Sequence, residues 1–256
     1  MVKFSTKNLS EKLIPWLVPI MLLVGWQLLS VVGIIPSRIL PAPTQVFQAA
    51  IDLSSTGELM DHVSISLGRA IIGFLIGGVI GFAFGLFNGI FRFAELFFDT
   101  SIQMLRNIPH LALIPLVILW FGIDETSKIF LVALGVMFPV YINTYHGIKS
   151  VDKGLIEMGK AYGLKGKALF FHVILPGAMS SILVGVRFSL GVMWLTLIVA
   201  ETISAHSGIG YMAMNAREFM QMDVIVLSIV LYALFGKLSD VIAKLFERKL
   251  LRWNGS

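Results

Sequence analysis

The chain has 256 residues, of which 57% are hydrophobic and only 14% are charged, with a formal net charge of +5. This composition excludes an ordinary soluble domain and indicates an integral membrane protein. Because the sequence holds no cysteine, it also excludes disulfide bonds, thiolate metal sites and cysteine nucleophiles.

Long runs without a charged residue predict membrane-spanning helices. The runs within 12–38, 69–92 and 128–149 hold 25, 22 and 20 uncharged residues. Each is long enough to cross ~30 Å of hydrocarbon as a helix. Three less regular apolar stretches lie at about 102–122, 178–202 and 222–243. The sequence therefore predicts an all-α protein with about six spans.

The first predicted span follows Lys3, Lys7 and Lys12. Its apolar run is longer than a signal-peptide core and lacks a clear A-x-A cleavage site, so we expect an uncleaved span. With the N-terminus inside, the loops expected at 1–13, 90–99, 147–177 and 237–256 hold 14 Lys and Arg residues on the cytoplasmic side, and the outer loops hold 3, out of 20. The positive-inside rule then places both termini in the cytoplasm, and the basic charge requires no nucleic-acid partner.

Five glycines in the second span lie four residues apart, at Gly73, Gly77, Gly81, Gly85 and Gly89. They share one helix face, where another backbone can approach closely. Helix packing is the favoured interpretation, and a glycine-lined conduit is the alternative.

The third span carries Arg106, Pro109 and His110 at or inside the membrane. Proline removes an amide donor and disfavours helix before it, so we expect a bend near Ile108. Backbone groups freed in this way must be buried in protein or line a cavity. The span is therefore a candidate for the translocation pathway, with a plain kinked packing helix as the alternative.

The widest polar gap, residues 148–177, is predicted to contain two short cytoplasmic helices. Residues at i, i+3, i+4 and i+7 give the first helix a mildly apolar face: Leu155, Met158, Gly159 and Tyr162. Gly163 is expected to end it in a left-handed cap, and Pro176 to end a second helix at about 165–173. A surface helix with such a face is typical of docking into a partner's groove.

This gap resembles the EAA signature of ATP-binding-cassette importer permeases. Glu157, Gly163, Leu175 and Pro176 match its ordered spacing, whereas Met158 and Gly159 stand where the family prefers alanines. Residues 99–125, 138–158 and 185–218 are similar to permeases of aliphatic-sulfonate importers, within the nitrate, sulfonate and taurine group. The resemblance covers about 15–253.

The resemblance implies a MetI-like permease fold, with residues 1–256 as a single transmembrane domain in the bacterial inner membrane. It implies import of aliphatic sulfonates, with taurine or nitrate as alternatives, and no catalysis by this chain. ATP and Mg²⁺ would be used by two separate ATPase subunits. A second permease copy and an extracytoplasmic sulfonate-binding protein would complete the assembly. The residues that would couple to the ATPase are Glu157, Met158, Gly159, Tyr162, Gly163, Leu175 and Pro176.

Two further charges within predicted spans, Arg187 and Glu201, join Arg106, Pro109 and His110 as pathway candidates. A charge at membrane depth costs at least ~2.5 kcal/mol, so such residues are functional candidates. Arg187 lies roughly 13 Å into its span at the helical rise, and could give a passing sulfonate a positive partner. Glu201 is expected near the outer interface, where water could solvate it. Interhelical pairing and snorkelling are the structural alternatives.

Other chemistries find weak support. GLIEMGKA at 154–161 approaches a phosphate-binding loop, but Ala161 stands where a Ser or Thr hydroxyl belongs. The histidines lack ligand spacing, so we expect neither a metal nor a cofactor on this chain. Two alternatives from other classes remain. An ion-driven carrier usually shows inverted repeats and acids at mid-depth, and the sequence shows neither clearly. An intramembrane hydrolase would need a paired catalytic set, which the sequence does not suggest.

Overall fold

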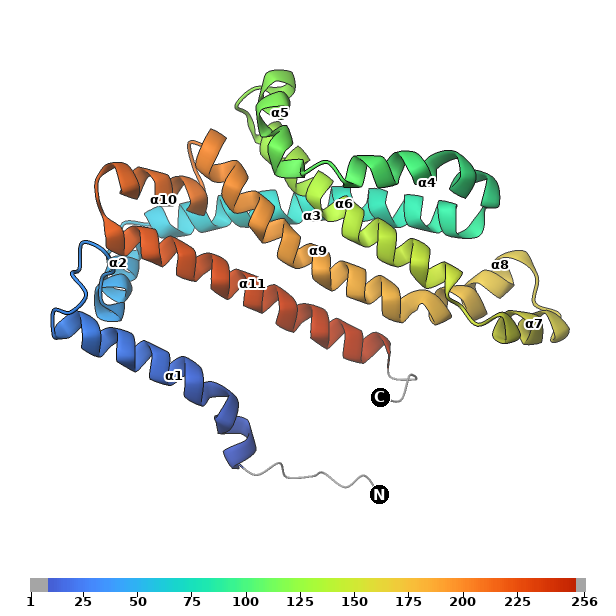
Figure 1. The fold of residues 1–256 in the computed structure, drawn as a ribbon, viewed down its shortest axis with the longest axis horizontal. Helices are drawn as coiled ribbons and strands as arrows, with labels where there is room; N and C mark the ends of the chain where they lie inside the picture. The colour runs from blue at the N-terminus through green and yellow to red at the C-terminus, as the bar shows by residue number, and fades with distance from the viewer. Residues whose placement is uncertain (1–8, 252–256) are drawn as a thin grey trace. The chain divides into compact units, whose positions relative to one another are not determined.

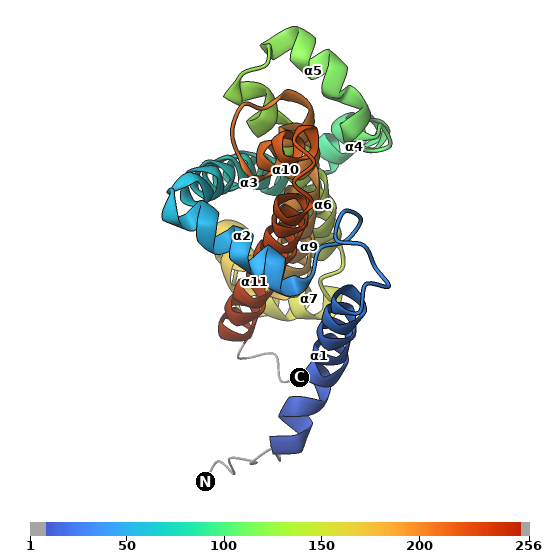
Figure 2. The same ribbon diagram turned by 90° about the vertical axis from the view of Figure 1, so that its left-hand side faces the viewer.

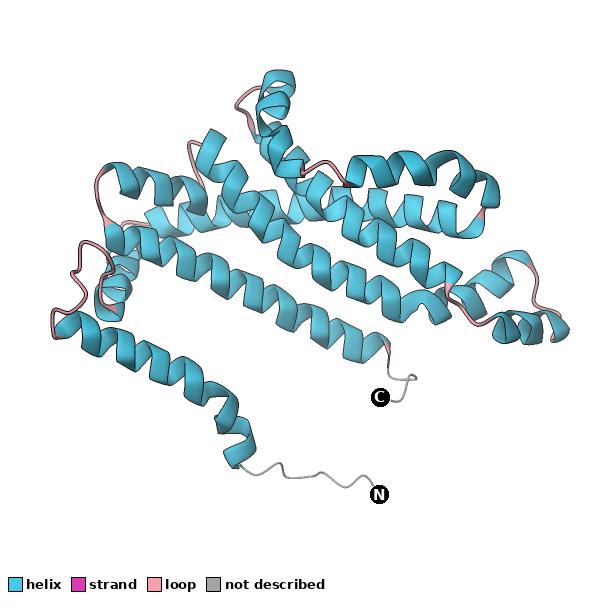
Figure 3. Ribbon diagram, in the orientation of Figure 1, coloured by secondary structure: helices cyan, strands magenta, loops and turns pink. Residues whose placement is uncertain are grey.

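The structure, a computed structural model, describes residues 9–251. Lys3, Lys7 and residue 253, which enter the predictions on topology and resemblance, lie outside this range. Every regular element in the described range is a helix (Figure 3), which confirms the all-α prediction. In chain order these are α1 (Leu9–Val31), α2 (Pro43–Ser55), α3 (Glu58–Ile90), α4 (Arg92–Arg106), η1 (His110–Leu113), α5 (Ile114–Phe121), α6 (Glu125–Lys149), α7 (Lys153–Ala161), α8 (Gly166–Leu169), η2 (Phe170–Ile174), α9 (Leu175–Ser204), α10 (Ile209–Glu218) and α11 (Met222–Leu250).

Four helical stretches of the described chain are long and apolar enough to cross a membrane: α3, α6, Gly166–Ile203 and α11. A fifth is formed if α4 and the η1–α5 pair count as one bent span. The apolar part of α1, Trp16–Val31, is shorter. The predicted spans near 69–92, 128–149, 178–202 and 222–243 are therefore confirmed, and α1, with 23 residues, lies within the region predicted as the first span.

The chain divides into two compact units, one of Met1–Asp61 with Met212–Val230 and one of His62–Tyr211 with Leu231–Ser256. In the first unit α1 and α2 are joined by a reciprocal contact, in which Gln27 Nε2 donates to Thr44 Oγ1 and Thr44 N donates to Gln27 Oε1, both at 3.3 Å. All the sites described below lie in the second unit. The single permease domain stays a prediction.

Within the second unit, α6 and α9 lie side by side (Figure 1). Figure 2 looks roughly along these two helices, and α5 stands at one side of them. A core cluster joins α5 to both through Ile114, Val117, Leu131 and Ala200, each at most 4% exposed. Burying such side chains stabilises the unit by about 1.5–3 kcal/mol each in water; within a bilayer close packing takes the place of that hydrophobic drive.

The glycine face of α3 packs against α6. All five glycines are buried. A Cβ atom added at Gly73 would lie 2.6 Å from Val132 Cγ1, and one added at Gly77 would overlap the backbone carbonyl of Ala133. The packing interpretation is thus confirmed, and the conduit alternative is wrong because α6 covers the glycines.

The bend predicted near Ile108 is confirmed. Helix α4 ends at Arg106, η1 begins at His110, and the two helical parts meet at 80°. Pro109, which has no amide hydrogen, stands directly before η1. Residues 90–99, expected to form a loop, are instead helical except at Phe91, which alone separates α3 from α4. Phe87 and Phe98 hold these helices together with ring centroids 6.3 Å apart.

Candidate functional site

The segment 148–177 contains the first of three candidate sites. Asp152 caps α7, since its Oδ1 accepts a hydrogen bond from Gly154 N at 2.7 Å. At the other end Gly163 has a φ of +85°. Gly163 N donates to Lys160 O at 2.9 Å and Leu164 N donates to Gly159 O at 3.0 Å. This pair of bonds is a Schellman motif, so the predicted glycine cap is confirmed.

The residues predicted to couple to a partner fall into two groups. Glu157, Met158 and Tyr162 are exposed, and Tyr162 is 82% exposed. Gly159 instead points into the segment, where an added Cβ would lie 2.9 Å from Leu169 Cδ1 and 3.1 Å from Val173 Cγ2. The exposed group is thus free to contact another protein, whereas Gly159 lets α7 pack closely on α8 and η2.

Pro176 does not end the second helix, contrary to the prediction. The chain continues from α8 through a π-helical turn, η2, into α9, where Pro176 occupies the first turn. Because Gly166–Ile203 is one continuous helical stretch, Pro176 lies inside it, and the helix continues past the missing amide through the irregular π turn that directly precedes α9. Leu175 packs beside Ile148, Val151, Ala178 and Ile182. Leu175 and Pro176 therefore join segment 148–177 to α9.

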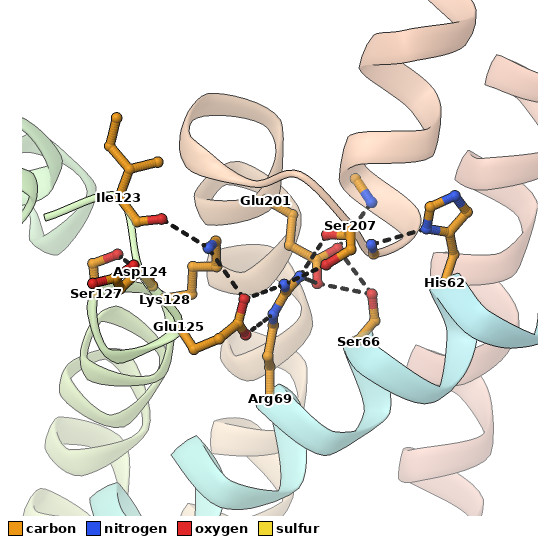
Figure 4. A network of polar contacts seen from close by, with 12 residues as sticks. His62, Ser66, Arg69, Ile123, Asp124, Glu125, Ser127, Lys128, Glu201 and Ser207 are labelled. Atoms are coloured by element: carbon orange, nitrogen blue, oxygen red, sulfur yellow. Dashed lines mark hydrogen bonds and ion pairs between the residues drawn. The ribbon is translucent and has the colours of Figure 1, made fainter.

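The second site is a buried ion network at the far end of α9, shown in Figure 4. Glu201 is 1% exposed, and Arg69 Nη1 donates to its Oε1 at 2.7 Å. Ser66 Oγ lies 2.8 and 2.9 Å from the two carboxylate oxygens. Tyr232 Oη and Gly210 N each donate to Oε2 at 2.9 Å. The carboxylate is fully hydrogen-bonded, as a buried charge requires.

The same arginine joins α3 to α6. Arg69 Nε and Nη2 donate to the two oxygens of Glu125 at 2.5 and 2.6 Å, in the forked geometry that suits guanidinium. Lys128 Nζ, itself 2% exposed, lies 3.4 Å from Glu125 Oε1. The network therefore contains two positive and two negative side chains, and its charges balance.

The turn after α9 is tied to this network through its backbone. Gly208 N donates to His62 Nδ1 at 3.1 Å, and Ile209 N donates to Ser66 Oγ at 2.9 Å. Arg69 Nη1 also donates to Ser207 O at 2.6 Å. Gly208 has a φ of +107°, and an added Cβ would lie 2.5 Å from Glu201 Oε1. The turn consequently depends on a glycine beside the carboxylate.

The expectation that water at the interface solvates Glu201 is wrong, and the interhelical-pairing alternative is confirmed. Sequence reasoning did not pair Arg69 with Glu201. A signal was present, because an arginine at one span edge and a glutamate near the end of another would each be costly alone. The contributions of Ser66, Tyr232 and the backbone amides had no sequence signal, since they depend on how the helices cross.

Arg187 is also paired. Its Nε lies 2.6 Å from Asp240 Oδ1 on α11, and Asp240 Oδ2 lies 3.0 Å from Lys244 Nζ. The arginine is 40% exposed along its side chain and borders a cavity of about 450 Å³. The pairing alternative is thus confirmed for Arg187, and its positive charge is largely met within the chain.

The third site, the α6 cavity, brings together Arg106, His110 and Asn143 in a hollow of about 290 Å³ bordered by α6 and α9. His110 Nε2 lies 3.0 Å from Thr196 Oγ1. Arg106 and Pro109 are exposed. Two of the predicted pathway residues, Arg106 and His110, therefore share one cavity, while Arg187 and Glu201 each lie elsewhere. In the described part of the chain, no three His, Asp or Glu side chains are grouped so as to hold a metal ion.

Comparisons of this sequence with known proteins agree on one family. Residues 65–252 match the family described as binding-protein-dependent transport system inner membrane component. An aliphatic sulfonates transport permease, SsuC of Escherichia coli, is 64% identical over 240 residues, which are 94% of this chain and 91% of that one. SsuC of Bacillus subtilis is 45% identical over 94% of this chain and 87% of its own. The taurine permease TauC of Escherichia coli is 34% identical over 91% and 87%.

Solved structures support the fold alone. A chain of an amino acid ABC transporter crystallised with histidines has a TM-score of 0.64 at 18% identity, covering 78% of this chain and 97% of that one. A chain of the inward-facing MetNI methionine ABC transporter has a TM-score of 0.56 at 19% identity, covering 72% and 93%. The arrangement of helices is therefore that of permease subunits, and the substrates of these distant structures do not carry over.

Proposed function

The chain belongs to the family of binding-protein-dependent transport system inner membrane components, and on that premise we propose that it is the permease subunit that moves aliphatic sulfonates across the membrane. The observation that carries this is the 64% identity to an aliphatic sulfonates permease over 94% of the chain. Taurine is less favoured, because the taurine permease is only 34% identical.

The energy for transport would come from a separate ATPase that docks on segment 148–177. Support comes from the exposed Glu157, Met158 and Tyr162, which present charge, thioether and aromatic surface on one short, well-capped helix. Helices that lie in a partner's groove use such exposed anchors. This chain would itself bind no ATP, Mg²⁺ or other cofactor, and would perform no catalysis.

The complete assembly would contain two copies of this chain, two ATPase subunits and an extracytoplasmic binding protein that sets most of the substrate selectivity. The chain would lie in the bacterial inner membrane with segment 148–177 and both termini in the cytoplasm. The excess of Lys and Arg in the loops on that side supports this orientation. Transport would proceed by alternating access, as movement of the ATPases tilts the spans.

Purification of the tagged chain from its native membrane tests the assignment. We expect an ATPase to copurify, and the reconstituted assembly with its binding protein to take up aliphatic sulfonates when ATP is supplied. Uptake by the chain alone, driven by an ion gradient, would contradict the proposal and support an ion-driven carrier. Competition by taurine and nitrate measures selectivity in the same assay.

The coupling residues are tested separately. Glu157→Lys should release the ATPase and abolish uptake while the chain still inserts in the membrane. Glu218→Lys is the matched control, because it makes the same charge reversal at an exposed glutamate on α10, which the topology places outside. If Glu157→Lys retains the ATPase as well as Glu218→Lys does, segment 148–177 is not the docking site, although sulfonate transport would stand.

A further inference from the structure

The α6 cavity lies beside the middle of two membrane-spanning helices. Its α6 residues, including Pro139 and Asn143, fall well inside Glu125–Lys149, and its α9 residues, Phe188 and Val192, fall well inside Leu175–Ser204. Polar side chains at that depth occur where they face protein or a water-filled space. A hollow that collects an arginine, a histidine and an asparagine at mid-depth is therefore a candidate for the route of a polar solute.

The charge in this cavity is available to a ligand. Arg106 is exposed, and across residues 9–251 no acidic side chain forms an ion pair with it. Arg187, the other arginine considered for this role, is held 2.6 Å from Asp240. An anion would gain little from an arginine already neutralised by a carboxylate, whereas Arg106 offers its forked donors without a competitor.

Two prolines lie in the cavity lining or next to one of its residues. Pro109 stands at the break between α4 and η1, and Pro139 lies inside α6. Because Pro139 has no amide hydrogen, the helix cannot hydrogen-bond the carbonyl of Gly135 in the usual way. A Cβ added at Gly135 would lie 2.8 Å from Thr196 Oγ1 and 3.4 Å from His110 Nε2. The absence of a side chain at Gly135 thus leaves room for the histidine to reach Thr196.

The remaining donors suit a group with several oxygens. Asn143 Nδ2 donates one hydrogen to Pro139 O at 2.9 Å and has a second hydrogen to give. His110 uses Nε2 toward Thr196, which leaves Nδ1. The other side of the cavity is apolar, with Ile142, Phe188 and Val192. A charged head group on a short hydrocarbon chain would find a partner for each part.

We propose that the α6 cavity is a transient binding site for the substrate, in which Arg106 pairs with the sulfonate group. Asn143 and His110 donate to the remaining sulfonate oxygens, and Ile142, Phe188 and Val192 contact the alkyl chain. Binding is weak, since a solute in transit must leave again. This inference rests on the proposed function, because it takes sulfonate transport as given and assigns the residues that select for it.

The test uses the complete assembly, reconstituted with its ATPase and binding protein, and measures uptake of labelled ethanesulfonate and octanesulfonate. Arg106→Gln is expected to lower uptake of both by roughly tenfold or more, as loss of a charge-assisted hydrogen bond implies. ATP hydrolysis stimulated by the loaded binding protein should stay within about twofold, because the ATPase contacts are untouched. Arg106→Lys should restore part of the uptake. Arg187→Gln is the matched control and should reduce uptake by less than about fivefold, because a partly exposed ion pair contributes little.

A second variant probes the apolar side. Val192→Phe narrows the cavity and should lower octanesulfonate uptake well below ethanesulfonate uptake, so it keeps the proposal testable if Arg106→Gln fails to insert. Equal uptake by Arg106→Gln and the unaltered assembly would overturn the site, as would an unchanged chain-length preference in Val192→Phe. A parallel loss of ATP hydrolysis in Arg106→Gln would also overturn it, by showing a role in assembly. The unaltered assembly distinguishes failure of the proposed function from failure of the proposed site. If the unaltered assembly takes up no sulfonate, the proposed function is wrong, whatever the variants do.

Discussion

The two ends of α9 are held in opposite ways. At the Glu201 end, four charged side chains and several backbone amides fix α3, α6 and the following turn around one buried carboxylate. At the Leu175 end, the helix runs into η2, α8 and α7 and ends in exposed side chains that include Tyr162. The difference teaches that one end is fixed by contacts within the chain, whereas the other leaves side chains exposed, as the proposed docking of an ATPase requires.

The largest loss is expected from disturbing the closed end. Glu201→Gln removes the charge that Arg69 and the surrounding donors neutralise, and breaking a buried ion pair costs about 3–5 kcal/mol of unfolding free energy. Reversible unfolding in mixed micelles measures this. Lys149→Gln is the control, since it breaks the partly exposed pair of Lys149 with Glu95 and should cost at most about 1 kcal/mol. Equal losses would remove the contrast between buried and exposed pairs.

A smaller loss of unfolding free energy is expected at the α3–α6 seam, where the glycine face of α3 packs against α6. Gly77→Ala forces a methyl group against the backbone of Ala133, which no rotamer change relieves, so we expect a loss of about 1–3 kcal/mol. Gly78→Ala is the neighbouring control, because nothing lies within 4 Å of its added Cβ, and alanine is the better helix former. The same unfolding assay compares them. If Gly78→Ala loses as much as Gly77→Ala, the seam is not what the second unit depends on.

A still smaller loss is expected from disturbing the C-terminal cap of α7. Gly163→Ala places a side chain at a φ of +85°, where L-residues pay roughly 1–2 kcal/mol. The added atom meets nothing within 4 Å, so the effect should be strain alone and confined to segment 148–177. Limited proteolysis of this segment should increase while the unfolding of the rest is unchanged. Gly163→Asn, which tolerates this conformation better, should lie between alanine and the unaltered chain.

The smallest effect on stability is expected at the open end. Tyr162→Ala removes a ring that is 82% exposed, and such surface changes usually stay within about 0.5 kcal/mol. Retention of the ATPase during purification should nevertheless fall several-fold, because exposed tyrosines are frequent anchors of interfaces. A variant that loses stability but keeps its ATPase would reverse the comparison between the two ends.

Local patterns in the sequence were sufficient to predict three features of the structure. The four-residue spacing of the glycines predicted the seam on α3, Pro109 predicted the 80° bend, and Gly163 predicted the end of α7. Each depends on residues close in the chain and on backbone rules that hold in any surroundings. The Arg69–Glu201 pair joins residues 132 positions apart, so it follows from helix packing that no local pattern encodes.

The wrong predictions also have physical causes. A charge count placed a loop at 90–99, although Arg92 and Glu95 lie on helix α4, where Glu95 forms an ion pair with Lys149 of α6. Pro176 was expected to stop a helix, but the chain passes it in a continuous helical stretch whose π turn lies just before the proline. The α6 cavity could be suspected from Arg106 and His110, whereas its Asn143 and Phe188 contributions required the crossing of α6 and α9.

The π turn at Phe170–Ile174 has a mechanical consequence. A π turn accommodates one residue more than an α-helical turn, and η2 places that surplus between α8 and the long shaft of α9. Rewinding it to α geometry would swivel α8 by about 100° about the shaft axis without breaking the helix. The π turn at the base of α9 therefore sets the rotational register between α9 and the segment that carries α7.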